Sequence, residues 1–364
     1  MLLKRLAGSL PPELASTIPE LESVGIKTTE SIIFTHPQTI LSLSSLTASQ
    51  VEALVYLCIE SSATRCAIAD ELPQQLQGPW QGWGIRGLDE LLDAWNGVGI
   101  VEIAGPRKVG KSLLALHAAL KILVQDKDAK CMWMDTEGTF SPERAEKILT
   151  NWGWKTEEER ISVLNRVIVT PCFKLEGVYE VLQTIKEPAQ GLDVGKTKVL
   201  IIDNIYIHFR DLLTNVSAQG HAELVALMEE VEEITYSQSM VSMIINSSVI
   251  SQPTNSLSHF NSVNIKPALG SSFTYLVDVT LLIQETGKVF GIMDEEERER
   301  IRKLPGLRGF VEVIKSRVSP TGLWTVFETD GTLLYHVVPP PMISQQPRGS
   351  PQSVIGPLKQ TMIP

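Results

Sequence analysis

The sequence has few cysteines and no long apolar run, and both absences exclude classes of protein. Its 364 residues include four cysteines, of which no two form a Cys-x-x-Cys pair. We therefore expect reduced thiols in an intracellular compartment rather than a disulfide framework or a zinc site. No apolar run approaches the ~18 residues that a membrane-spanning helix needs, so no membrane partner is expected. The apolar part of the first ten residues is also too short for a secretory signal.

Positive charge is in short supply as well. The chain has 32 Lys and Arg against 42 Asp and Glu, which gives a formal net charge of −10 at pH 7. Non-specific adhesion to nucleic acid needs clustered cations, so contact with nucleic acid is expected only locally or together with a partner. The 43% of hydrophobic residues is typical of a globular protein, with length for one large or two unequal domains.

Changes of periodicity divide the chain into four parts. Residues 1–60 carry apolar residues three and four apart behind Pro, Ser and Thr, which predicts a small all-α domain of four or five helices. Gln, Pro and Gly in 61–81 predict a linker. In 82–337 short apolar strands alternate with helical segments, which predicts an α/β core with helices on both faces of a mostly parallel sheet. Residues 338–364 are rich in Pro, Ser and Gln and are expected to be disordered.

The core is predicted to contain six strands followed by an antiparallel hairpin. The turn segment "RVSPT" separates the two apolar arms of the hairpin, which begin near Arg308 and Gly322. The six strands are predicted over 99–104, 129–135, 166–171, 198–203, 239–245 and 278–284.

One segment between a predicted strand and a predicted helix has the pattern G-x-x-x-x-G-K-[ST]. Its glycines let successive backbone N–H groups point at phosphate oxygens. Lys111 can reach the β- and γ-phosphates, Ser112 can ligate Mg²⁺, and the following helix presents its positive N-terminus. An accidental glycine turn is the alternative. The nucleotide-binding residues predicted here are Gly105, Pro106, Arg107, Lys108, Val109, Gly110, Lys111, Ser112 and Leu113.

Carboxylates at the ends of two other predicted strands complete a candidate site. Asp203 follows four apolar residues and can hold the metal through its water shell, although an aspartate that caps a turn is the alternative. Asp135 and Glu137 follow the strand before it and supply a candidate base to orient the attacking water. The D-x-E-G pattern is weak alone, and its position in the chain between the other two elements strengthens it.

At this point the sequence resembles a known family. "DTEGTFSPER" is very similar to the segment of the RecA/RadA family of strand-exchange ATPases that carries the water-activating glutamate. "GIRGLDELLD", "KPALG" and "VEVIKSRVSPTGLWTVFETDG" agree with the same family, and the N-terminal helices resemble the small domain that precedes the core in eukaryotic and archaeal members. The resemblance covers roughly residues 15 to 336. It implies a RecA-like P-loop ATPase fold with ATP and Mg²⁺ as ligands.

The resemblance also implies roles for individual residues. Glu137 would be the catalytic base and Arg144 would stack on the adenine, while Ser112 and Asp203 would hold Mg²⁺. Lys266 and Pro267, in the "KPALG" turn, would cap a nucleotide bound by the neighbouring subunit. Family members hold ATP at subunit interfaces, so oligomerisation would be part of the site.

The segments at the positions of the family's two DNA-binding loops depart from its pattern. In the first, family recombinases carry arginine near the positions of Gln219 and Glu223 onward. This chain instead has Gln219, His221 and then Glu229, Glu230, Glu232 and Glu233. Apolar residues at helical spacing predict that these glutamates are the solvated face of a helix. The second has one Lys, one His and Phe260 as the only aromatic residue to stack a base. Ser248 stands where recombinases carry a glutamine that senses the γ-phosphate, and serine is too short for that reach.

Two segments for self-assembly and phosphate contact are missing too. The linker has no Phe for the Phe-x-x-Ala segment by which recombinases polymerise, although Ile68 and Leu72 could serve another partner. The N-terminal domain has "LSSLTASQ" in place of a Gly-x-Gly hairpin, which favours packing or protein binding over contact with phosphate.

Taken together, the resemblance implies a recombinase paralogue, most similar to the D-type. The expected function is that of an ATP-binding, slowly hydrolysing subunit of a heteromeric complex in the nucleus, which assists recombinase filaments in homologous recombination repair. The expected partners are other paralogues, the recombinase filament and single-stranded DNA, bound weakly or together with partners. A filament-forming, DNA-dependent ATPase that exchanges strands itself is one alternative, and a scaffold that binds ATP without hydrolysing it is another.

Overall fold

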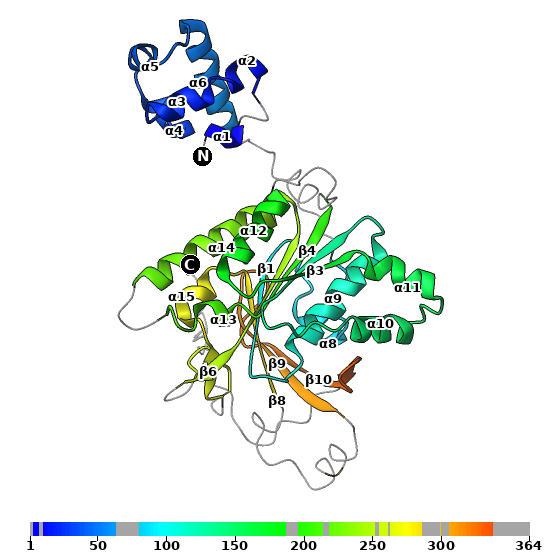
Figure 1. The fold of residues 1–364 in the computed structure, drawn as a ribbon. Coiled ribbons are helices and arrows are strands. Elements are labelled where there is room, and N and C mark those ends of the chain that lie inside the picture. Colours follow the sequence, from blue (N-terminus) through cyan, green and yellow to red (C-terminus); the bar gives the residue numbers. More distant parts are fainter. Residues whose placement is uncertain are drawn as a thin grey trace, which may run out of the picture. The chain divides into compact units, whose positions relative to one another are not determined.

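The computed structural model describes nine stretches of the chain, which form two compact units, residues 1–73 and 74–364. Figure 1 colours them from the blue N-terminal unit to the orange end of the second unit. The predicted tail, most of the predicted linker and Cys66 lie outside the described residues, whereas Cys58, Cys131 and Cys172 are buried free thiols. The described residues are 3–6, 10–62, 80–186, 196–213, 218–251, 255–260, 263–285, 299 and 306–337.

The N-terminal unit is all-helical. Proline in the first turn of α2 and α5 fits helix starts, and the Thr28 hydroxyl accepts the Ser31 N–H at 3.1 Å to cap α4. Leu21, Ile32 and Leu54 are fully buried in its core. The described residues contain one helix more than the largest number expected, because α1 and α2 are single turns. The helices are α1 Leu3–Leu6, α2 Pro12–Ala15, α3 Ile18–Ser23, α4 Thr29–Phe34, α5 Pro37–Leu43 and α6 Ala48–Ser62.

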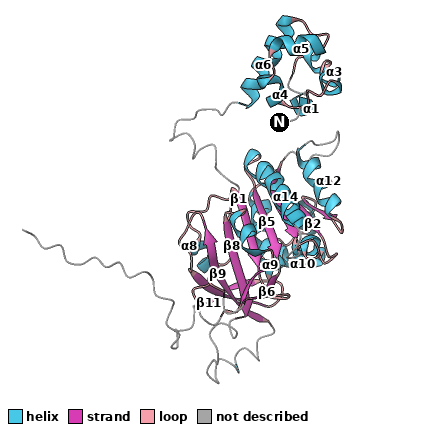
Figure 2. Ribbon diagram, turned by 90° about the vertical axis from the view of Figure 1, so that its left-hand side faces the viewer, coloured by secondary structure: helices cyan, strands magenta, loops and turns pink. Residues whose placement is uncertain are grey.

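A nine-stranded sheet forms the centre of the second unit, in the order β11-β10-β9-β8-β1-β5-β4-β2-β3. Figure 2 draws its strands in magenta. The strands from β8 to β3 in this order are parallel, whereas β9, β10 and β11 are antiparallel. The strands are β1 Gly99–Ala104, β2 Lys130–Asp135, β3 Val167–Pro171, β4 Thr197–Asp203, β5 Val241–Asn246, β8 Val279–Glu285, β9 Leu307–Ser316, β10 Trp324–Thr329 and β11 Leu334–Val337. All six strands predicted before the hairpin are present, and the hairpin itself is β9–β10. The predicted α/β class, with a mostly parallel sheet and a C-terminal antiparallel hairpin, is therefore confirmed.

Helices cover both faces of this sheet (Figure 1). Alternate residues of β1 point to opposite faces, so Val101 and Ile103 pack with α8, α9 and α10, whereas Ile100 packs with α12 and α14. The helices are α8 Arg86–Leu91, α9 Lys111–Gln125, α10 Pro142–Asn151, α11 Glu157–Leu164, α12 Leu175–Lys186, α13 Tyr206–Phe209, α14 Ala218–Ser237 and α15 Gly270–Tyr275. The short strands β6 Ser248–Ile250 and β7 Ile265–Pro267 form a separate antiparallel pair.

Within the described ranges, no single helix is both long and apolar enough to cross a bilayer. Only the pair α5–α6 meets that criterion when taken together, and it is bent by 120° at its break.

Parallel pairing brings the carboxyl ends of the central strands to one edge of the sheet. Ala104 at the end of β1 pairs with Asn246 at the end of β5, and Asp135 pairs with Asp203. In open α/β sheets, ligands bind outside this edge. The predicted phosphate loop follows β1 at this edge, and Asp203 ends β4 there.

Candidate nucleotide site

The phosphate loop joins β1 directly to α9, and its backbone requires glycine. Gly105 has φ 154°, and a Cβ at this position would lie 2.2 Å from the carbonyl oxygen of Ile283 on β8. Gly110 has φ 97° and is the N-cap of α9. Such left-handed backbone is open to glycine without steric cost. The loop therefore approaches the neighbouring strand closely and ends at a helix N-terminus, the arrangement that binds phosphate.

Lys111, the first residue of α9, is buried and turned back over the loop. Its Nζ donates to the carbonyl oxygens of Gly105 at 2.9 Å and Pro106 at 2.6 Å. Burial lowers the pKa of Lys111 to about 8, while the charges of Asp203 and Glu137 act in the opposite direction. The ammonium group is therefore mostly charged at neutral pH and lies inside the loop that would surround the phosphates.

Asp203 lies at the end of β4 with its carboxylate buried beside the loop. Burial raises its pKa to about 6, the hydrogen bond from the Ser112 side chain lowers it, and the charge of Asp135 raises it further. Among the described residues no cluster of three or more His, Cys, Asp or Glu is placed to hold a metal ion. A cation here would therefore be held by Ser112, by Asp203 and by oxygens of phosphate and water, as Mg²⁺ prefers.

Asp135 and Glu137 have separate parts in this site. The Asp135 carboxylate accepts the backbone N–H groups of Glu137 at 3.2 Å, Gly138 at 2.8 Å and Phe140 at 2.8 Å, so it fastens the turn after β2. The Glu137 side chain is partly exposed, and its Oε1 accepts a hydrogen bond from Arg107 Nη2 at 2.9 Å. The sequence offered both acids as carriers of the chemistry, and the geometry leaves Glu137 as the one available to water.

Hydrogen bonds between the strand ends, which sequence reasoning missed, support these groups. Thr136 Oγ1 accepts the Asn204 N–H at 2.7 Å, and Asn204 Nδ2 donates to Ser247 Oγ at 2.9 Å. The Asp203–Asn204 peptide bond is cis. Thr, Asn and Ser at strand ends carry no distinctive spacing in a sequence, so only their position in space identifies them.

Glu102 is a second residue that the sequence did not single out. It lies in the middle of β1, fully buried, and accepts hydrogen bonds from Asn246 Nδ2 at 2.6 Å and from Thr280 Oγ1 at 3.0 Å. Burial raises its pKa to about 7, against the effect of these hydrogen bonds. A lone Glu within "GIVEIA" gave the only signal, because an acid in an apolar strand needs a partner if both faces are covered.

The remaining predicted site residues lie on other elements. Arg144 is exposed on α10, whose first turn is capped by Ser141 Oγ accepting the Arg144 N–H at 3.2 Å. On β7, Lys266 is exposed whereas Pro267 is buried within its own chain. The structure thus brings Gly105–Leu113, Glu137 and Asp203 together at the sheet edge, and leaves Lys266 as the member of its pair that a neighbouring molecule can reach.

The segment expected as the first DNA loop leads into α14, as the helical spacing predicts. Leu224, Leu227, Val231 and Ile234 are buried against the sheet. Glutamates line the outer side, where Lys186 of α12 pairs with Glu230 at 3.4 Å and with Glu233 at 2.6 Å. The prediction that the acids form a solvated helix face is confirmed, and the surface that follows this loop is acidic.

In the second loop, Phe260 differs from the expectation. Its ring is 3% exposed and packs edge-on against Phe310, with centroids 5.1 Å apart, and against Trp324 at 5.5 Å. The prediction that Phe260 is available to stack a base is therefore wrong. Glu312, buried on β9, accepts Ser258 Oγ at 2.7 Å and the His259 N–H at 2.5 Å, which fastens the segment 255–260 to the C-terminal strands.

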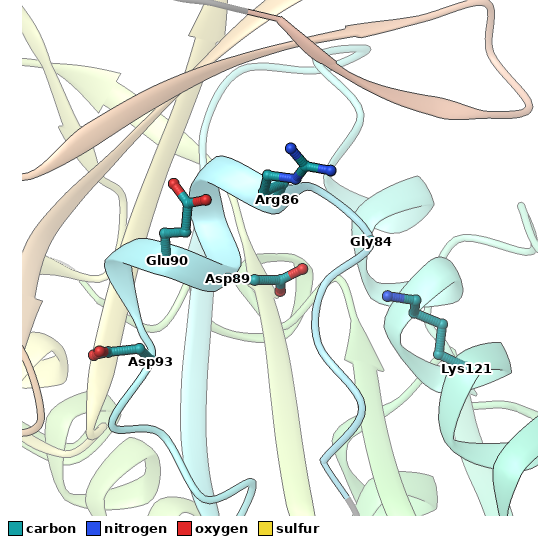
Figure 3. A pocket seen from close by; sticks show the side chains of 6 residues that line it. All are labelled: Gly84, Arg86, Asp89, Glu90, Asp93 and Lys121. Carbon is teal, nitrogen blue, oxygen red and sulfur yellow. The ribbon is translucent and has the colours of Figure 1, made fainter.

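A broad open hollow lies elsewhere, between α8 and α9 (Figure 3). Its volume is about 540 Å³, and Lys121 stands at its edge. Lys121 is ten residues beyond Lys111, which is about 15 Å along the helix. The hollow is therefore separate from the phosphate loop. Its lining residues are Gly84, Arg86, Asp89, Glu90, Asp93 and Lys121.

Comparison with known proteins places this geometry in a family. The chain is 23% identical over 286 residues to DNA repair protein RAD51 homolog 4 of Bos taurus, covering 77% of this chain and 85% of that protein. It is 26% identical over 212 residues to DNA repair protein rhp51 of Schizosaccharomyces pombe, covering 57% and 55%. A crystal structure of the RadB recombinase shares the fold, with a TM-score of 0.53 and 20% identity over 71% of this chain and 99% of that one. The family profile described as Rad51 matches residues 82–291, more than half of the sequence, so the chain belongs to the Rad51 family.

Proposed function

We propose that this chain is an ATP-binding Rad51-family paralogue, one subunit of a heteromeric complex that assists recombinase filaments on single-stranded DNA in homologous recombination repair. The observation that carries the proposal is the contrast between an intact phosphate-binding apparatus and a second loop whose only aromatic ring is buried. Relatives named as DNA repair proteins support the process, and the nucleus is the proposed compartment for an activity on chromosomal DNA.

The residues of the site fit a nucleoside triphosphate with Mg²⁺. Backbone N–H groups between Gly105 and Leu113 would hold the phosphates. The close approach of this loop to β8 leaves no room for a Cβ at Gly105. Lys111 would neutralise phosphate charge from inside the loop, and Ser112 with Asp203 would hold the cation. The nucleotide supplies the γ-phosphoryl group and the cation stabilises its charge. Arg144 would then stack on the adenine of the nucleotide.

Glu137 would orient the attacking water from its fastened turn. Asp135 accepts three backbone N–H groups and so fixes the backbone of that turn. The Glu137 side chain therefore extends from a fixed Cα, while its carboxylate can change rotamer. A positioned base of this kind contributes about 10²- to 10⁴-fold to a rate. We propose slow turnover, with the bound ATP chiefly stabilising an interface to which a neighbouring subunit contributes the equivalents of Lys266 and Pro267.

The loops favour a paralogue over a self-sufficient recombinase. Single-stranded DNA is bound by cationic grooves and by exposed rings on which bases stack. Here the ring of Phe260 is enclosed and α14 presents glutamates. Partners would thus include other paralogues and the filament, with DNA bound weakly or jointly. The proposed D-type assignment rests on "GIKT" in the N-terminal unit and on the motifs "GLDELLDA" and "IKPALGSSFTYLVDVTLLI".

The test combines nucleotide binding, hydrolysis and particle mass for the full chain and for Lys111→Ala. ATP affinity is expected to fall at least about 100-fold in Lys111→Ala, because a buried charge facing the phosphates is lost. Lys121→Ala is the matched control, since it removes the same charge from the same helix outside the site. Assembly with the paralogue that caps this nucleotide should weaken in Lys111→Ala alone.

Other outcomes would select other functions. Long homopolymers of the isolated chain with hydrolysis strongly stimulated by DNA would replace the proposal with strand exchange. Retained ATP with no hydrolysis in any complex would leave a scaffold. An unchanged ATP affinity in Lys111→Ala would refute the nucleotide site itself.

A further inference from the structure

One ion pair joins the phosphate loop to the turn that carries the proposed base. Arg107 Nη2 lies 2.9 Å from Glu137 Oε1, and the two side chains are 78% and 29% exposed. Arg107 stands two residues after Gly105, and Glu137 stands two residues after the end of β2. The contact therefore spans the two segments between which a terminal phosphate and its attacking water would lie.

Of the cations in this loop, Arg107 is the one paired with Glu137, beside the exposed Lys108 and the buried Lys111. Lys111 is buried and its ammonium group is already engaged by two carbonyl oxygens of the loop. The Arg107 side chain is long and mostly in solvent, so its pair with Glu137 is weakly held. Guanidinium groups bind phosphate in two-pronged geometry and with charge-assisted hydrogen bonds. A triphosphate in this loop presents more negative charge to Arg107 than one carboxylate does.

We propose that Arg107 is a positioning residue for Glu137 that is shared with the nucleotide. Paired with Glu137, it holds the carboxylate against the phosphate loop; drawn to the phosphates, it frees the carboxylate to orient water. Glu137 is thereby restrained until the loop is occupied. The inference rests on the proposed function, in that the loop binds a triphosphate and Glu137 is the base.

The restraint has a consequence for binding that does not depend on hydrolysis. Part of the affinity for the triphosphate is used to separate Arg107 from Glu137. Removing the carboxylate therefore strengthens binding in two ways, by ending its repulsion of the phosphates and by freeing Arg107. When Arg107 is absent, only the first effect remains. The two residues are thus coupled in nucleotide affinity, and salt weakens this coupling because both side chains are exposed.

The test is a double-mutant cycle on the full chain with Arg107→Gln, Glu137→Gln and the double variant. Affinity for a non-hydrolysable ATP analogue is measured by calorimetry at low salt and at 0.5 M salt. Glu137→Gln is expected to tighten binding about two- to fivefold more in the presence of Arg107 than in its absence. Arg107→Lys should keep part of this coupling, because it keeps the cation.

The outcomes separate this inference from the proposed function. Equal effects of Glu137→Gln with and without Arg107, in proteins that bind the analogue, would overturn the inference and leave the nucleotide site standing. Lys121→Gln in place of Arg107→Gln is the matched control, and it should show no coupling with Glu137→Gln. No binding of the analogue by any of the proteins would overturn both.

Discussion

The phosphate loop follows β1 and the second loop follows the neighbouring strand β5, but the two loops expose different chemical groups. The phosphate loop presents backbone N–H groups and cationic side chains at the edge of the sheet. Its path depends on the positive φ angles of Gly105 and Gly110. The second loop buries its aromatic ring, where Phe260 packs on Phe310, and one of its hydroxyl groups, where Ser258 donates to Glu312. The phosphate loop is therefore suited to bind an anion, whereas the second loop packs against its own chain.

The difference shows that two neighbouring loops of one fold can follow separate constraints. A phosphate site is a property of a short contiguous segment, because its donors are consecutive backbone N–H groups. A docked loop depends on partners far away in the sequence: Ser258 and Glu312 are 54 residues apart. Glu102 connects the two regions. It lies on β1, the strand before the phosphate loop, and accepts a hydrogen bond from Asn246, the last residue of β5 before the second loop.

Gly105→Ala gives the largest expected effect, because it attacks the feature on which the phosphate loop depends. The new Cβ would lie 2.2 Å from a backbone oxygen at φ 154°, so β1 and β8 would have to separate. We expect a loss of about 5 kcal/mol or more in the free energy of unfolding and no detectable ATP binding. Urea unfolding and calorimetry measure the two effects.

Gly177→Ala is the matched control for this change. Gly177 lies in α12, where the nearest atom to a new Cβ is 3.8 Å away. Alanine there should stabilise the protein by about 0.5–1 kcal/mol, because glycine is a poor residue for a helix interior. A stable, ATP-binding Gly105→Ala variant would show that the loop does not need its close approach to β8.

Phe260→Ala tests the second loop, whose aromatic ring is buried. Removal of a ring that packs on Phe310 and Trp324 should cost about 3–4 kcal/mol of unfolding free energy. Affinity of the folded protein for single-stranded DNA should stay within about twofold, since a buried ring stacks no base. Phe173→Ala is the control, because Phe173 is 65% exposed and its loss should change stability by less than about 0.5 kcal/mol. A large loss of DNA affinity with little loss of stability would return Phe260 to the role that the sequence suggested.

Glu102→Gln tests whether Glu102, which connects the two regions, makes the free energy of unfolding depend on pH. Burial raises the pKa of Glu102 from 4.5 to about 7, so the folded chain binds this proton more tightly than the unfolded chain does. Its contribution to the free energy of unfolding therefore falls by about 3 kcal/mol as the pH rises from about 4.5 to about 7, and stays low above that. Glu102→Gln should lose this decline in urea unfolding between pH 5 and pH 8. Glu90→Gln, at an exposed position, should keep it, and a decline shared equally by Glu102→Gln would place the titrating group elsewhere.

The elements that could be predicted from the sequence are those with local causes. Six strands appear as apolar runs of the right length, and the phosphate loop is a contiguous pattern between a strand and a helix. The acidic face of α14 follows from the spacing of Leu224, Leu227, Val231 and Ile234 alone. The position of Glu137 beside the phosphate loop could be predicted because its segment is contiguous, and its side chain is partly exposed there.

The elements that could not be predicted depend on contacts between distant segments. Phe260 is a lone aromatic in a polar stretch, and nothing nearby indicates that Phe310 and Trp324 enclose it. Asp135 looks like a second acid of the site until the three N–H groups that it accepts are seen in space. The short pair β6–β7 was missed for the same reason, since three-residue strands have no periodicity to detect.

The smallest expected effect concerns charge, and it tests whether the acidic face of α14, which follows the segment expected as the first DNA loop, repels single-stranded DNA. Glu229→Lys and Glu232→Lys reverse exposed charges on α14, so the unfolding free energy should change by less than about 0.5 kcal/mol. Affinity for single-stranded DNA at low salt should rise only about twofold for each change, because exposed charges are screened. Glu146→Lys on α10, which packs on the opposite face of the sheet, is the control for the change in net charge. A rise of tenfold or more on α14 alone, measured by fluorescence anisotropy, would mean that a bound strand passes along this helix. The acids, rather than the enclosed ring of Phe260, would then be what separates this chain from a DNA-binding recombinase.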